Sequence, residues 1–134
     1  MKITLDTNIL IAAFISRGVC SDLFEYCIRQ HEVFTSQYIL KEFTTQLNEK
    51  FKVSRTEVSE AKKLLRSRMQ AVIPLKLPKS LCRDPNDVPI LGTALASKSQ
   101  CLITGDKDLL ELEAYEGIAI IPPASFWQFE TQHR

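Results

Sequence analysis

The sequence of 134 residues has little histidine and no closely spaced cysteine pair. Its two histidines, His31 and His133, lie far apart, and its four cysteines form no C-x-x-C motif. A zinc knot, a thiol redox motif and catalysis built on histidine are therefore not expected. We expect the four thiols to be reduced and mostly buried, as free cysteine commonly is in a protein core.

The sequence also lacks a long apolar run. No stretch approaches the roughly 18 residues that a membrane span needs, and the first residues do not have the pattern of a signal peptide. These absences predict a cytoplasmic protein with no membrane partner. The composition, with 45% hydrophobic and 25% charged residues and only four glycines, is typical of a globular protein. At this length it predicts a single domain over residues 1–134.

Charge is unevenly distributed, although the formal net charge is only +1. Residues 50–83 contain ten basic and two acidic side chains, whereas residues 84–134 contain three basic and eight acidic ones. A basic segment next to an acidic one suits a polyanionic substrate held beside carboxylates. A solvated helix face also explains the basic segment, and charge alone favours this plainer interpretation.

Hydrophobic periodicity predicts that strands alternate with helices along the whole chain. Strands are expected at 1–5, 32–35, 71–75, 101–104 and 118–121. Helices are expected at 9–15, from a cap at Ser21 to about residue 30, at 37–51 after Ser36, at 55–69 after Ser54, from residue 85 after Asp84, and at 109–112 after Asp108. Pro89 predicts an irregular start for the helix after Asp84. The alternation indicates an α/β fold with a mostly parallel sheet of about five strands and helices on both faces.

Four acidic residues fall where such a sheet would bring them to one edge. Asp6 and Asp106 each end a strand, Glu42 lies early in one helix, and Asp87 begins another. Because the carboxyl ends of parallel strands meet at the same edge, we expect these four carboxylates to converge. Like charges so close repel, and a divalent cation is the usual remedy. Ligands that are all oxygen favour Mg²⁺ or Mn²⁺.

The polar residues near these acids have two interpretations each. Thr7, Asn8 and Thr104 could orient the carboxylates, or could only bond within their own turns. Asp84 and Asp108 are more simply explained as helix caps than as ligands, because Asp is a favoured N-cap residue. Taken alone, any one acid could be structural. The four together are what indicates a metal site.

Four motifs of the chain resemble those of the PIN-domain ribonucleases, in particular the group related to VapC-type toxins of toxin-antitoxin pairs. They are LDTNIL at 5–10, SQYILKEF at 36–43, CRDPNDVPIL at 82–91 and LITGDKDLL at 102–110, and their order and spacing cover the chain. The resemblance implies a PIN-like three-layer sandwich, hydrolysis of RNA with Mg²⁺ or Mn²⁺, an antitoxin partner and a homodimer. It implies that the catalytic and metal-binding residues are Asp6, Glu42, Asp87 and Asp106, supported by Asn8 and Thr104, with Asp84 and Asp108 as further candidates.

The residues fit this chemistry independently of the resemblance, because cations held by carboxylates generate hydroxide near neutral pH and stabilise the oxygen that leaves phosphorus. Two alternatives stay open. One is a PIN scaffold that binds RNA or a protein without cleaving. The other is a phosphoacceptor receiver domain, which shares the sheet and an acidic Mg²⁺ pocket. The receiver is disfavoured because it needs two adjacent acids after the first strand, where this chain has Asp6 and Thr7.

Overall fold

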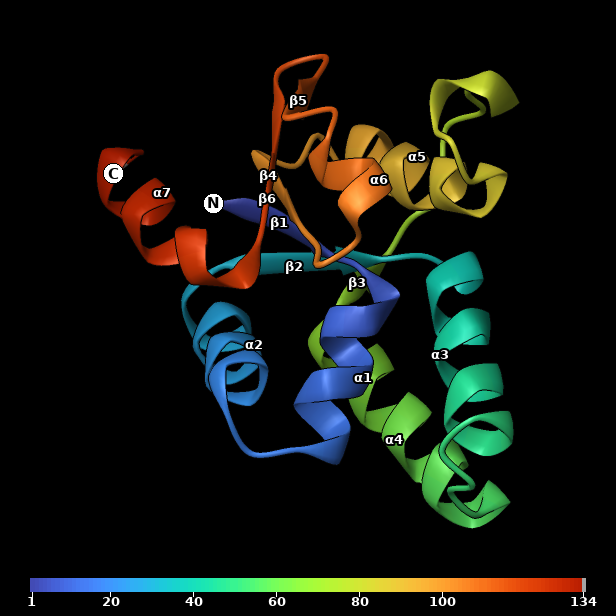
Figure 1. The fold of residues 1–134 in the computed structure, drawn as a ribbon. Coiled ribbons are helices and arrows are strands. Elements are labelled where there is room, and N and C mark those ends of the chain that lie inside the picture. The colour runs from blue at the N-terminus through green and yellow to red at the C-terminus, as the bar shows by residue number, and fades with distance from the viewer. Residues whose placement is uncertain (134) are drawn as a thin grey trace.

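A six-stranded sheet forms the middle layer of the computed structural model, which describes residues 1–133 (Figure 1). The strands are β1 (Lys2–Leu5), β2 (Glu32–Thr35), β3 (Gln70–Ala71), β4 (Cys101–Ile103), β5 (Ala114–Tyr115) and β6 (Ile118–Ile121), in the order β3-β2-β1-β4-β6-β5. All neighbouring strands pair in parallel except β5, which is antiparallel to β6. The expected α/β fold with a mostly parallel sheet is confirmed, with one strand more than expected.

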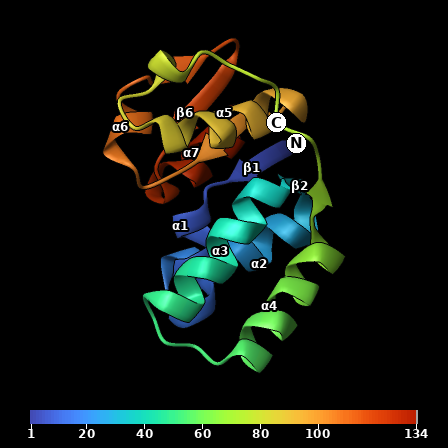
Figure 2. The same ribbon diagram turned by 90° about the vertical axis from the view of Figure 1, so that its right-hand side faces the viewer.

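Helices cover both faces of this sheet, as expected. Within residues 1–133 they are α1 (Thr7–Ile15), α2 (Val19–Gln30), α3 (Gln37–Glu49), α4 (Arg55–Arg68), α5 (Val88–Ala96), α6 (Lys107–Leu110) and α7 (Phe126–Gln132), with short 3-10 turns η1 (Lys79–Leu81), η2 (Pro85–Asp87) and η3 (Pro123–Ser125). In both views α1 to α4 lie on one side of the sheet, and α5 and α6 lie on the other (Figures 1 and 2). The C-terminal α7 was not anticipated from the sequence.

The central strands β1 and β4 are apolar on both faces because helices cover both. Ile3 and Leu5 on β1 and Leu102 and Ile103 on β4 are fully buried. Such continuous apolar runs are typical of parallel strands with two covered faces. Cys27, Cys82 and Cys101 are also buried, Cys20 is half-buried, and all four thiols are free, as the sequence predicts. The core therefore holds the strand ends in fixed register.

Two helix caps are confirmed and two are wrong. The Ser36 and Ser54 hydroxyls accept the backbone N–H groups of Ile39 and Glu57 and cap α3 and α4. Ser21 is not a cap, because α2 already begins at Val19. Asp108 is not a cap either: Asp106 occupies that position, and its Oδ1 accepts the Asp108 N–H at 2.8 Å. The helix after β4 therefore begins two residues earlier than expected.

The strand expected at 71–75 is also wrong, because β3 ends at Ala71. Pro74 has no N–H with which to extend a strand ladder. The Leu75 N–H instead bonds to the Gly92 carbonyl on α5 at 3.1 Å. A Cβ at Gly92 would lie 2.4 Å from the Leu75 oxygen, so only glycine permits this close approach. Separately, none of the helices within residues 1–133 is long and apolar enough to cross a membrane alone, and the one pair that would be so together, α1 and α2, is bent by 109°.

Candidate metal centre

The carboxyl ends of β1, β2 and β4 lie at one edge of the sheet, and each leads into an element that carries an acid. Asp6 follows β1, Glu42 lies in the second turn of α3 after β2, and Asp106 follows β4. Asp87 ends η2, just before α5. The beginnings of α1 and α3 and the short α6 surround this edge (Figure 1). The topology thus collects the acids that the sequence singled out.

Thr104 joins the first and fourth of these acids. Its fully buried hydroxyl donates to Asp6 Oδ2 at 2.6 Å and accepts the backbone N–H of Asp106 at 3.0 Å. The parallel register of Leu5 with Ile103 places the two strand ends level, and the Asp6 N–H bonds to the Ile103 carbonyl at 3.0 Å. Thr104 therefore lies where the sequence suggested a supporting residue, and it holds Asp6 and Asp106 in fixed relation.

Glu42 has a similar partner on α1. The Thr7 hydroxyl donates to Glu42 Oε1 at 2.5 Å. This bond positions a carboxylate that reaches the site from a helix rather than from a strand end. Asn8, the other candidate in this motif, is exposed and makes no side-chain hydrogen bond within residues 1–133. The structure therefore links Thr7 to an acid and leaves the Asn8 amide open to solvent.

The other acids form a compact group. One carboxylate oxygen from each of Asp87, Asp106 and Asp108 lies within 4.8 Å of the others. Asp87 is only 6% exposed, and its Oδ2 has no hydrogen-bond partner among the residues that the structure describes. Asp84 is exposed and instead caps η2, where its Oδ1 accepts the Asn86 N–H at 2.9 Å. Of the two further candidates, the structure brings Asp108 into the group and gives Asp84 the role of a cap.

Burial and mutual repulsion change the acidity of this edge. Burial raises the pKa of Asp6 to about 6, with repulsion from Glu42 and Asp106 adding to the shift and the Thr104 hydrogen bond opposing it. Burial also raises the pKa of Asp87 to about 7, reinforced by repulsion from Asp106, Asp6 and Asp84. A bound cation would remove the cost of ionising both groups. Buried oxygen donors that are too acidic to coexist comfortably fit a hard divalent cation, either Mg²⁺ or Mn²⁺.

Tyr38 is a residue at this site that the sequence analysis did not single out. Its hydroxyl donates to the Asn86 carbonyl at 2.9 Å and so ties α3, which carries Glu42, to the turn that carries Asp87. Burial raises the pKa of Tyr38 to about 12, and repulsion from Glu42 is the next largest cause. The signal was its position one helical turn before Glu42, on the same side of α3.

Basic side chains reach the same edge. Arg83 Nη1 lies 3.9 Å from Asp108 Oδ1, although the Arg83 side chain is 78% exposed. Lys107, between the two acids of the α6 turn, is also exposed. The last residue of the basic segment therefore lies beside the acidic group, where it could contact a phosphate.

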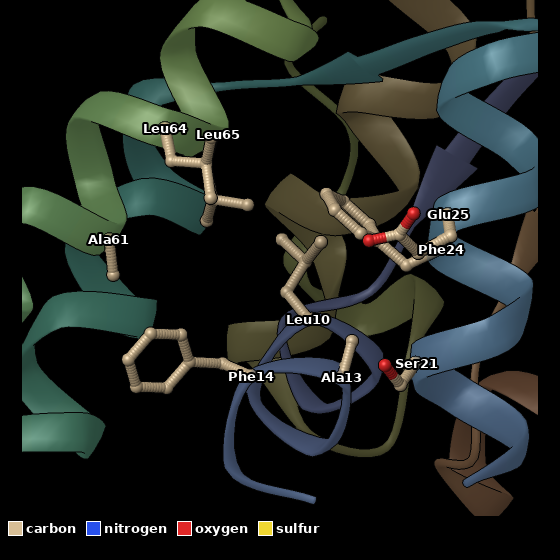
Figure 3. A pocket seen from close by; sticks show the side chains of 9 residues that line it. All are labelled: Leu10, Ala13, Phe14, Ser21, Phe24, Glu25, Ala61, Leu64 and Leu65. Atoms are coloured by element: carbon tan, nitrogen blue, oxygen red, sulfur yellow. The ribbon is translucent and has the colours of Figure 1, made fainter. Parts of the chain in front are cut away.

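A separate apolar pocket lies between α1, α2 and α4 (Figure 3). Figure 3 shows the Leu10, Phe14 and Leu65 side chains pointing into the space between these helices. The whole lining consists of Leu10, Ala13, Phe14, Ser21, Phe24, Glu25, Ala61, Leu64 and Leu65. None of these residues belongs to the acidic group, so this surface is distinct from the candidate metal centre.

The fold and the acidic edge define an α/β domain whose site is built at the carboxyl ends of parallel strands. A family model described as the PIN domain matches residues 2–108, and the chain belongs to the PIN-domain family. This membership replaces the receiver-domain alternative. The fold is also similar to that of a chain in the crystal structure of VapBC2 from Rickettsia felis bound to a DNA fragment from their promoter, with a TM-score of 0.65 and 16% sequence identity over 90% of this chain and 97% of that one. No match is found among curated proteins.

Proposed function

We propose that this protein is a metal-dependent endoribonuclease in which Asp6, Glu42, Asp87 and Asp106 hold Mg²⁺ or Mn²⁺. The observation that carries the proposal is the convergence of carboxylates at one sheet edge, where the buried Asp87 has an oxygen without a partner. Membership of the PIN-domain family supports it, because PIN domains are generally nucleases. Zinc fits less well, since no histidine or cysteine belongs to the acidic group.

The divalent cation would supply a hydroxide near neutral pH and stabilise the oxygen that leaves phosphorus. The protein's own part is to fix the carboxylates. Thr104 orients Asp6 and Asp106, and Thr7 orients Glu42, through the bonds described above. Such partners of metal-binding carboxylates commonly affect metal affinity or activity by 10- to 100-fold. The exposed Asn8 amide is placed to contact the substrate rather than the cation.

RNA is the proposed substrate because its phosphates suit the mixed charge of this edge. Arg83 and Lys107 are exposed beside the acids and can hold backbone phosphates without reading sequence. We place the activity in the cytoplasm, where such a substrate is available. A PIN scaffold that binds RNA without cleaving keeps the same basic residues, and it differs only in the chemistry at the carboxylates.

We further propose that the protein is the toxin of a toxin-antitoxin pair. The solved structure with a similar fold contains VapBC2. In this chain the apolar pocket of α1, α2 and α4 offers a docking surface for an antitoxin protein, because Phe14 and Leu64 at its margin are 42% and 52% exposed. Exposed apolar side chains around a pocket commonly mark protein interaction sites. A homodimer stays a prediction from the resemblance.

The experiment is cleavage of an end-labelled, generic single-stranded RNA after the protein has been stripped of metal with EDTA. We expect cleavage to require added Mn²⁺ or Mg²⁺ and to fall at least about 100-fold in Asp6→Asn. Asp22→Asn is the matched control, because Asp22 is an exposed acid in the first turn of α2. Cleavage that persists in EDTA or in Asp6→Asn would contradict the proposal. RNA binding without cleavage would favour the scaffold.

A further inference from the structure

We propose that Asp108 is a cation ligand of this site, acting together with Asp87 and Asp106, rather than a residue of the helix cap. The inference extends the proposed function by one ligand and rests on it for the kind of site. Cation binding can nevertheless be measured without RNA, so the two claims can fail separately.

The turn after β4 gives Asp106 and Asp108 different tasks. Asp106 Oδ1 accepts the Asp108 N–H at 2.8 Å, and this bond caps α6. The Asp108 side chain is therefore not used for capping. It lies instead with the Asp87 and Asp106 side chains, and one oxygen from each of the three is within 4.8 Å of the others. The spacing D-x-D thus delivers two carboxylates to one place, because one of them also closes the turn.

A second, independent observation indicates that this group awaits a ligand. Asp87 is only 6% exposed, and its Oδ2 is buried without a hydrogen-bond partner in residues 1–133. Buried polar atoms are nearly always partnered, so each exception needs an explanation. An unpaired oxygen in a group of three carboxylates is explained if a cation is its partner. No purely structural role of Asp108 accounts for that oxygen.

The spacing of the group suits a hard divalent cation after a small adjustment. A Mg²⁺ ion about 2.1 Å from each ligand places opposite oxygens roughly 4.2 Å apart. The Asp108 side chain is 25% exposed and can move inward by this amount, whereas Asp87 is fixed by burial. The only basic group paired with Asp108 in the described chain is Arg83, at 3.9 Å and 78% exposed. Such an exposed, long pair contributes little stability, and a divalent cation can displace it.

The experiment is calorimetric titration of the metal-free protein with Mn²⁺ alone, in the absence of RNA. We expect Asp108→Asn to weaken binding at least about tenfold, because an amide keeps the shape but loses an anionic ligand. Asp84→Asn is the matched control, since Asp84 only caps η2 and Asn caps equally well. It should bind within about twofold of wild type, a change of less than about 0.5 kcal/mol. Melting curves in EDTA establish that each variant is folded.

The possible outcomes separate the two claims. If wild type binds Mn²⁺, Asp6→Asn weakens binding, and Asp108→Asn binds as wild type does, this inference is wrong and the proposed function stands. If wild type binds no Mn²⁺ at millimolar concentration, the metal site of the proposed function fails and this inference fails with it. If Asp84→Asn weakens binding as much as Asp108→Asn, the effect reflects overall negative charge and the inference is also wrong.

Discussion

Thr104→Val tests whether one buried hydroxyl holds the acidic edge together. Thr104 is fully buried, and its Oγ1 donates to Asp6 Oδ2 at 2.6 Å while accepting the Asp106 N–H at 3.0 Å. Valine has nearly the same shape but can make neither bond. The substitution therefore leaves the packing nearly unchanged and removes only the polar link between the two strand ends.

The expected loss follows from the kind of bond. A hydrogen bond to a charged group contributes about 1.5–3 kcal/mol, and Asp6 Oδ2 would be left buried without this donor. The half-exposed Asp106 N–H can turn to water and adds little. We therefore expect the free energy of unfolding to fall by about 2–3 kcal/mol. For a chain of this length, the corresponding drop in Tm is roughly 10 °C.

The assay is urea unfolding in EDTA at slightly alkaline pH, where Asp6 is ionised. Thr104→Ser is the matched control because it keeps the hydroxyl and loses only a methyl group, at a cost of about 1 kcal/mol. We also expect Thr104→Val, but not Thr104→Ser, to bind Mn²⁺ more weakly. If the two variants unfold at the same urea concentration, the hydroxyl does not hold Asp6 and the reasoning is refuted.

Three further predictions concern pH, position and charge. Because the pKa of Asp6 is raised from 3.8 to about 6, its carboxyl stabilises the metal-free fold fully below about pH 4, and about 3 kcal/mol is lost as pH rises through about 6. Unfolding measured across this range in EDTA should show the fall, and Asp6→Asn should remove it; an unchanged slope in that variant would contradict the assignment. Tyr38→Phe should cost less than about 1 kcal/mol in unfolding free energy, since the Asn86 carbonyl can bond to water, but should weaken Mn²⁺ binding because the turn that carries Asp87 is loosened. Equal Mn²⁺ affinity in a titration would limit Tyr38 to packing. Lys107→Gln should weaken RNA binding at every sequence and lower the salt slope by about one, as measured by fluorescence anisotropy, and an unchanged slope would place the RNA elsewhere.

The positions of Asp6 and Asp106 could be predicted because they depend on short local patterns. A buried β-branched run followed by a polar turn fixes a strand end, and parallel strands bring such ends to one edge. Glu42 could be predicted because Ser36 caps α3 and so sets the helical phase. In these cases the local sequence and the tertiary fold favour the same conformation.

The roles of Asp106 and Asp108 could not be separated in the same way. Both residues of a D-x-D spacing can cap a helix, and the choice depends on where the preceding strand ends. The strand β4 ends at Ile103, one residue before the expected boundary, and so the helix begins at Lys107. An error of one or two residues at a boundary thus changed which acid was assigned to the cap.

The missing elements have a different cause. The strand β5 has only two residues, and its pairing with β6 depends on a tight turn in which Glu116 and Gly117 both have positive φ. A two-residue strand shows no periodicity that could be recognised. The Tyr38 contact was missed because it joins residues 48 positions apart. Such a contact depends on how α3 and η2 pack, which a sequence pattern does not encode.

The most direct test of the account is one Mn²⁺ titration of the EDTA-treated protein, in which RNA cleavage and thermal stability are followed on the same samples. A cation that binds the folded acids and not the dispersed carboxylates of the unfolded chain raises Tm by mass action. We predict that Tm and the cleavage rate rise over the same range of Mn²⁺ concentration in wild type, and that neither rises over that range in Asp6→Asn. Cleavage without a rise in Tm, or equal responses in the two proteins, would contradict a catalytic metal site at this edge.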